Sequence, residues 1–162
     1  MKTLLIMRHA KSSWKHPELA DRDRPLNKRG EKEAPRMGKV LKHADILPQL
    51  IYTSSAVRAS KTAETVAEII GYKKEILYKD ALYMAEPSQI VDVLRETPDE
   101  IKRVMVIGHN PGMEGLAQML SRKVESLCTA AIACIKLPID HWSDLTLEVE
   151  GKLVKVWEPK EH

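Results

Sequence analysis

The feature that most constrains this sequence is a set of short apolar runs alternating with helical patterns. Thr3–Met7 reads TLLIM and Arg103–Gly108 reads RVMVIG, with little polar character inside either run. Such runs are typical of strands that are buried on both faces of a parallel sheet. Similar character predicts further strands at 49–53, 75–79, 131–137, 144–149 and 153–157. Glu150-Gly151 suits a tight turn, so the last two strands are predicted to form a hairpin.

Helical patterns fill the intervals between these strands. Predicted helices run from an Asn27 cap to about His43, from a Ser55 cap to Gly71, from Pro87 to about Glu96, and onward from Asn110-Pro111. Strand–helix alternation indicates an α/β fold. We expect a three-layer sandwich, with helices on both faces of a mainly parallel sheet and one antiparallel element. The 162 residues fit a single domain spanning residues 1–162.

Charge and cysteine content exclude several classes of protein. The formal net charge is +3, and basic residues are interleaved with acids, so no nucleic-acid-binding surface is expected. Cys128 and Cys134 form no Cys-x-x-Cys pattern and are expected to be reduced thiols. The apolar run before Arg8 is too short for a signal peptide or a membrane span. We therefore expect a cytoplasmic protein that does not act at a membrane.

Two histidines and two arginines follow predicted strand ends. Arg8 and His9 come directly after the first strand, and His109 comes after RVMVIG. Arg58 lies in the first turn of the helix that follows the second strand. In open α/β sheets, ligands bind at the carboxyl ends of the strands, so we expect these four side chains on one rim.

These residue types suit phosphoryl transfer. Two guanidinium groups can hold a phosphoryl group through several fixed donors. A neutral imidazole is a competent nucleophile near neutral pH, and the second histidine, if protonated, would stabilise developing charge. Taken singly, each residue could be a solvated loop or surface side chain. A metal site at His9 and His109 is disfavoured by the two neighbouring cations, and no metal is predicted.

Four segments carry a resemblance to a known family. They are LLIMRHAKSSW, DRDRPLNKRGEKEA, IYTSSAVRASKTAE and VMVIGHNPGMEGLA. Together they resemble the histidine phosphatase superfamily, and within it the short phosphohistidine phosphatase (SixA-like) branch. The resemblance implies a phosphoglycerate-mutase-like fold and a metal-independent hydrolase without a cofactor. It also implies that His9 is the histidine that becomes phosphorylated, assisted by Arg8, Arg58 and His109.

Two departures from the family pattern concern the site. The usual Arg-His-Gly ends in Ala10 here, which predicts a less tight turn if that position needs a positive φ. Larger relatives carry a general acid after the third strand, where Glu86 is the one carboxylate in ALYMAEPSQI. Glu86 precedes Pro87 and could equally cap a helix. Arg24 and Asp21, from DRDRPL, are further candidates for contact with substrate.

Because Glu86 could equally cap a helix, the sequence identifies no definite general acid. This favours phosphohistidine as substrate, because imidazole leaves more easily than an alkoxide. The expected partner is a phosphorylated protein, with histidine-containing phosphotransfer proteins as one possibility, or a small phosphorylated molecule. One alternative is a phosphatase of small metabolites that uses Glu86 as its acid. Another is a non-catalytic module that binds phosphate groups without hydrolysing them.

Overall fold

The computed structural model describes residues 1–124 and 126–161, in which six strands form one mixed sheet in the order β3-β2-β4-β1-β5-β6. The strands are β1 (Lys2–Arg8), β2 (Leu50–Ser54), β3 (Leu77–Lys79), β4 (Arg103–Gly108), β5 (Ile132–Leu137) and β6 (Lys152–Trp157). β1, β2, β3 and β4 are mutually parallel, and β5 pairs antiparallel with both β1 and β6. The predicted mainly parallel sheet with an antiparallel element is confirmed.

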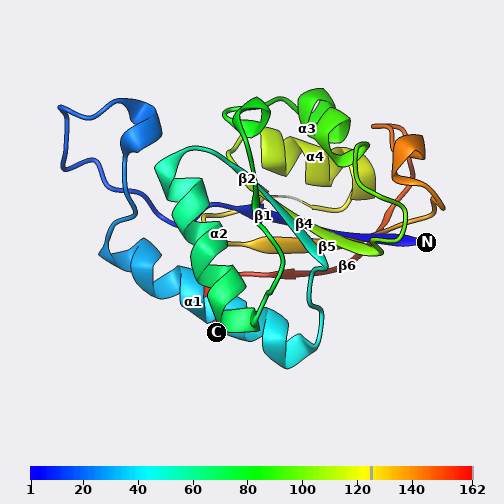
Figure 1. The fold of residues 1–162 in the computed structure, drawn as a ribbon, viewed down its shortest axis with the longest axis horizontal. Helices are drawn as coiled ribbons and strands as arrows, with labels where there is room; N and C mark the ends of the chain where they lie inside the picture. The colour runs from blue at the N-terminus through cyan, green and yellow to red at the C-terminus, as the bar shows by residue number, and fades with distance from the viewer. Residues whose placement is uncertain (125, 162) are drawn as a thin grey trace.

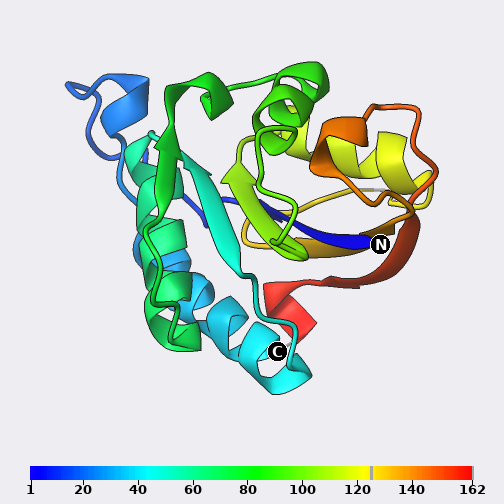
Figure 2. The same ribbon diagram turned by 45° about the vertical axis from the view of Figure 1, so that its right-hand side comes forward.

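Helices cover both faces of this sheet (Figures 1 and 2). The helices are α1 (Lys28–Ala44), α2 (Val57–Ile70), α3 (Pro87–Leu94) and α4 (Gly112–Ser121). Alternate residues of β1 point to opposite faces, so Leu5 and Met7 pack with α1 and α2 while Leu4 and Ile6 pack with α3 and α4. Burial on both faces is the reason that this strand has an unbroken apolar sequence.

The predicted helix ends are partly confirmed. The Asn27 side chain accepts a hydrogen bond from the Gly30 amide at 2.8 Å and caps α1. Gly71 ends α2 with a φ of 74°, a conformation that glycine adopts at little cost. The prediction that Ser55 caps α2 is wrong. Ala56 holds the cap position, and the Ser55 hydroxyl instead donates to Asp80 at 2.5 Å.

The predicted strand over Asp144–Val149, and with it the closing hairpin, is also wrong. A short 3-10 helix, Trp142–Asp144, ends where this segment begins, residues 145–149 form no strand, and β6 pairs with β5. Leu145 is fully buried, and Leu147 and Val149 pack against the same core. The alternation of apolar side chains in this segment therefore reflects one-sided packing of an irregular chain.

The chain topology opens a crevice between β1 and β4. These strands are adjacent and parallel, with Arg8 opposite Gly108 at their carboxyl ends. The connection through α1 leaves β1 over one face, and the connection through α4 leaves β4 over the other. Adjacent strands whose connections depart to opposite faces create the ligand-binding crevice of open α/β sheets. Within the described ranges, no helix has the length and apolar character needed to cross a membrane.

Candidate active site

His9 and His109 are neighbours at the mouth of this crevice. Each follows the last residue of its strand, and their ring centroids lie 5.1 Å apart. Arg8 precedes His9, and Arg58 reaches the same cavity from the first turn of α2. The four residues expected on one rim are therefore brought together.

The His9 ring is held in one tautomer by the backbone. Its Nδ1 lies 2.7 Å from the Ala10 carbonyl oxygen, and a carbonyl can only accept, so Nδ1 carries the proton. That leaves an unprotonated Nε2 with a free lone pair. Burial, with a smaller contribution from the nearby arginines, lowers the pKa of His9 to about 4. The imidazole of the free protein is therefore neutral near pH 7, as a nucleophile must be.

His109 is held by a side chain. Its Nε2 lies 2.8 Å from the Ser54 hydroxyl oxygen, and the Tyr83 ring meets it edge-on with centroids 5.4 Å apart. Burial, followed by the neighbouring His9 and Arg58, lowers the pKa of His109 to about 3. The sequence leaves a protonated second histidine open, whereas this lowered pKa makes the ring neutral in the free protein near pH 7. It can serve a bound anion as a neutral hydrogen-bond donor.

Both rings should remain neutral well below the ordinary histidine pKa. Protonation of His9 would remove the Nε2 lone pair, so the neutral form of the ring is lost as the pH falls through about 4. We expect the ring nitrogen signals of His9 and His109 to stay in the neutral pattern between about pH 8 and about pH 5, measured by ¹⁵N-edited NMR. A titration midpoint near 6.5, the ordinary pKa of histidine, for either ring would contradict this expectation.

Arg58 is fixed by Asp21. Its Nη1 donates to the Asp21 carbonyl at 2.6 Å and its Nη2 donates to the Asp21 carboxylate at 2.9 Å. The same carboxylate accepts from Arg24 Nη1 at 2.9 Å and from the Tyr83 hydroxyl. Hydrogen bonds from Tyr83, Arg24 and Arg58 hold the pKa of the Asp21 carboxyl below its ordinary value. Asp21 is therefore a permanent anion that positions two cations.

Arg24 holds the segment that follows His9 close to the site. Its Nε donates to the Ser13 carbonyl at 3.1 Å and its Nη2 donates to the Ser12 hydroxyl at 2.5 Å. The guanidinium carbon also lies 3.3 Å from the centroid of the Trp14 ring. Arg24 thus forms a wall of the cavity and braces the start of the loop between β1 and α1.

Arg8 is only partly satisfied by the protein. Its Nη1 donates to the Leu127 carbonyl at 3.3 Å, and the Asn110 side chain donates to the same oxygen at 2.9 Å. The Nε of Arg8 is buried without a hydrogen-bond partner among the described residues. A buried donor without a partner beside a cavity is available to an incoming oxygen.

The turn after His9 does not need glycine. Ala10 has no positive φ, and its amide donates to the Thr62 hydroxyl of α2 at 3.0 Å. That hydroxyl in turn donates to the Arg58 carbonyl at 2.7 Å. The alanine in place of the family glycine therefore introduces no backbone strain, and the turn is tied directly to the helix that carries Arg58.

The two histidines and the arginines of the site surround a cavity of about 290 Å³. Its lining residues are Arg8, His9, Lys11, Ser12, Trp14, Asp21, Arg24, Arg58, Met84, His109, Asn110 and Thr129. Glu86 is not among them. It caps α3, and its amide donates to the Gln89 side chain at 2.8 Å. A larger hollow of about 600 Å³ lies between α1 and β6 but contains none of the four clustered residues.

Sequence reasoning missed several participants. Ser54 and Tyr83 act through contacts with distant residues, and no local motif marks such contacts. Ser54 does end a strand on the rim that holds the histidines, so the rule that located them could also have indicated it. Trp14 and Met84 stand at the cavity mouth, and Trp14 is 75% exposed. No group of three or more His, Cys, Asp or Glu side chains is placed to hold a metal ion in the described ranges.

Comparisons with known proteins identify the family of this chain. Residues 4–83 match the family model of the histidine phosphatase superfamily (branch 1). An uncharacterized chloroplastic protein of Arabidopsis thaliana is 34% identical over 151 residues, covering 87% of this chain and 69% of the relative. An uncharacterized protein of Mycobacterium tuberculosis is 30% identical, covering 86% of this chain and 91% of the relative. The chain belongs to the histidine phosphatase superfamily.

Solved structures share the whole fold. The protein histidine phosphatase SixA complexed with tungstate has a TM-score of 0.83 at 23% identity, covering 98% of each chain. A mycobacterial glucosyl-3-phosphoglycerate phosphatase complexed with VO₃ has a TM-score of 0.69 at 14% identity, covering 96% of this chain and 98% of its own. The phosphoglycerate-mutase-like α/β fold expected from the sequence is thereby confirmed.

Proposed function

We propose that this protein is a phosphatase that forms a covalent phosphohistidine on His9 and that its substrate is a phosphohistidine carried by another protein. The observation that carries the proposal is the state of the His9 ring. Its Nδ1 proton is held by the Ala10 carbonyl, and Nε2 is unprotonated in a cavity lined by Arg8, Arg58 and His109. A binding module would need the arginines but not a nucleophile prepared in this way.

The chemistry takes two steps. The Nε2 lone pair attacks phosphorus, and the P–N bond to the substrate imidazole breaks with its electron pair remaining on the leaving nitrogen. The leaving ring, protonated on its other nitrogen, departs as neutral imidazole. Water then attacks phosphorus, the bond to His9 breaks, and dihydrogen phosphate is released. Because the Ala10 carbonyl keeps the Nδ1 proton in place, the His9 ring is also released from phosphorus as a neutral imidazole.

The carboxylates support phosphohistidine over an alkyl phosphate. An alkoxide leaving group needs a positioned acid, whereas a protonated imidazole does not. Among the described residues that line the cavity, Asp21 is the only carboxylate, and its hydrogen bonds keep it ionised. Glu86 caps α3 outside the cavity lining. Neither carboxyl group is placed as a proton donor.

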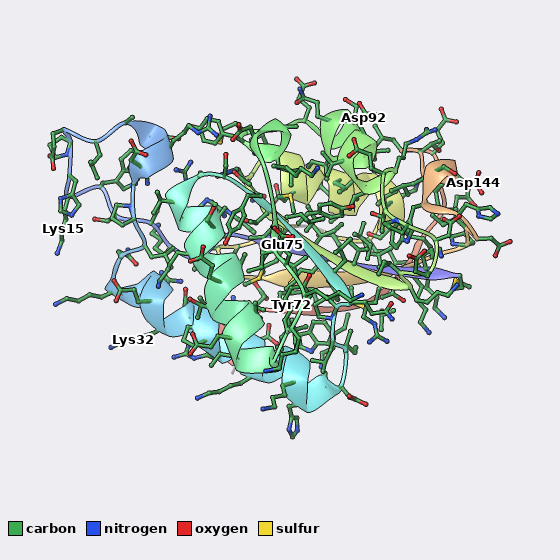
Figure 3. All side chains as sticks on the ribbon, viewed as in Figure 1. Lys15, Lys32, Tyr72, Glu75, Asp92 and Asp144 are labelled. Atoms are coloured by element: carbon green, nitrogen blue, oxygen red, sulfur yellow. The ribbon has the colours of Figure 1, made fainter. Side chains whose placement is uncertain are left out.

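The surroundings of the cavity support a substrate presented on a protein. Trp14 and Met84 lie exposed at its mouth, and Lys15 lies on the loop between β1 and α1 that extends beyond the sheet (Figure 3). Exposed residues at the cavity mouth can contact the surface of a substrate protein around its phosphorylated side chain. We place this activity in the cytoplasm, which agrees with two free cysteine thiols.

A Glu86→Gln variant separates this proposal from a metabolite phosphatase that uses Glu86 as its acid. Because Glu86 lies outside the cavity lining, we expect turnover of phosphohistidine and of sugar phosphates to change by less than about twofold, well below the loss typical for a general acid. Steady-state hydrolysis of both substrates measures this, with Glu100→Gln as an exposed control. A large loss on sugar phosphates alone would favour the metabolite phosphatase.

A further inference from the structure

The two histidines of the site are held in different ways. The His9 ring is fixed by a carbonyl, which accepts and never donates. The His109 ring is fixed by a hydroxyl, which can do either. The chemistry that His109 offers to a ligand therefore depends on the direction of the hydrogen bond from Ser54.

The surroundings of Ser54 determine that direction. Its side chain is fully buried at the end of β2, and its oxygen already accepts the Ala56 amide at 3.2 Å. Among the described residues, the only recorded partner that could accept the Ser54 hydroxyl proton is Nε2 of His109, 2.8 Å away. If Nε2 carried a proton instead, the hydroxyl hydrogen would be buried without an acceptor, which is unfavourable. The arrangement that satisfies both groups has Ser54 donating to Nε2.

A neutral imidazole that accepts at Nε2 must carry its proton on Nδ1. The Nδ1 of His109 is buried and has no partner among the described residues, although the ring lines the cavity. We propose that Ser54 is a positioning residue that holds His109 as its Nδ1–H tautomer, so that Nδ1–H is reserved as a donor to an oxygen of the phosphoryl group. The role of that donor rests on the proposed function, whereas the tautomer does not.

The arrangement gives two similar rings different tasks. In His9 the Nδ1 proton is engaged by the protein, and Nε2 is free to attack phosphorus. In His109 the Nε2 lone pair is engaged by the protein, and the Nδ1 proton is free to be donated. With the opposite tautomer, His109 would present a lone pair toward an anionic phosphoryl group and repel it. A preorganised donor of this kind acts most strongly in the transition state.

The tautomer is directly measurable. Long-range ¹H–¹⁵N correlation spectra of the labelled protein distinguish the protonated ring nitrogen from the bare one, and His9→Ala and His109→Ala variants assign the signals. We expect the Nδ1–H pattern for His109 in the wild type and an Nε2–H population in Ser54→Ala. Inorganic phosphate, used as the probe, should shift the Nδ1 signal of His109 in the wild type. An Nε2–H pattern for His109 in the wild type, or no response to inorganic phosphate, would overturn the inference.

Kinetics provide a second measurement. We expect Ser54→Ala to lower kcat by about tenfold to 100-fold with a smaller change in KM, as for other groups that orient a functional histidine. Ser60→Ala is the matched control, because its hydroxyl donates to the Ser54 carbonyl at 3.0 Å and has no recorded contact with His109. Ser54→Cys preserves the volume if the alanine variant does not fold. Wild-type kcat in a folded Ser54 variant would refute the positioning role, and absence of a phosphoenzyme would refute the proposed function while leaving the tautomer standing.

Discussion

A His9→Ala variant is expected to form no phosphoenzyme and to lose activity by at least about 10⁴-fold, as enzymes do when their nucleophile is removed. Incubation of the wild type with a labelled phosphohistidine substrate should leave a label that is lost in acid and stable in base, as a phosphoramidate is. The variant should carry none. Its substrate site is otherwise intact, because the cations that line the cavity are supported by Asp21 and by backbone carbonyls.

Binding distinguishes a lost nucleophile from a lost fold. His9→Ala should still bind inorganic phosphate, measured by calorimetry, because Arg8 and Arg58 remain. His16→Ala, a change of the same residue type at an exposed position, should keep both label and turnover. A labelled His9→Ala protein would place the nucleophile elsewhere. A wild type that binds phosphate but takes no label would favour the non-catalytic binding module.

The second large effect is expected at Arg58. Replacement by alanine should lower kcat/KM by on the order of 10²- to 10³-fold, comparable to the loss of an oxyanion donor. Two terms contribute to this loss. The guanidinium no longer stabilises the phosphoryl oxygens, and Asp21 loses two hydrogen bonds from Arg58, one to its carboxylate and one to its backbone carbonyl. Steady-state kinetics should be combined with a thermal denaturation curve to verify that the fold persists.

Two further variants separate these terms. Arg58→Lys restores the charge but not the planar fork, so it should recover only part of the activity. Adding Asp21→Asn to Arg58→Ala removes a carboxylate charge that only Arg24 still offsets, and it should recover part of the phosphate affinity. Arg36→Ala, a change on α1 outside the cavity lining, should have no effect. Wild-type kcat/KM in a folded Arg58→Ala protein would refute the placement of Arg58 at the phosphoryl group.

Local sequence predicted the fold where burial produces a local pattern. β1 and β4 are apolar throughout because both faces are covered, and Asn27 and Gly71 satisfy the ends of their own helices. The errors occurred where distant partners decide the structure. Ser55 precedes a helix but does not cap it, because its hydroxyl donates a hydrogen bond to Asp80. Apolar and polar side chains alternate over Asp144–Val149 as they do in a strand, yet this segment forms no strand. The strand that pairs with β6 is β5.

The candidate site follows the same division. The strand-end rule located His9, His109 and Arg58, because the carboxyl ends of parallel strands share one rim. It could not reveal that Asp21 joins Arg58 to Arg24, because that contact depends on the path of a loop. The catalytic roles of these residues, and contacts of Arg24, Asp21 and Glu86 with substrate, stay predictions until kinetics test them.

The loop between β1 and α1 is closed at its base by contacts within the loop and is attached to α2. Ser12 and Ser13 accept hydrogen bonds from Arg24 of the same loop, and Asp21 accepts one from Arg58 of α2, whereas Lys15 and its neighbours are exposed. Evolution could therefore replace or lengthen the tip between these anchors without moving the reactive imidazoles. Grafting tips from other superfamily members onto this scaffold would be a direct route to altered selectivity.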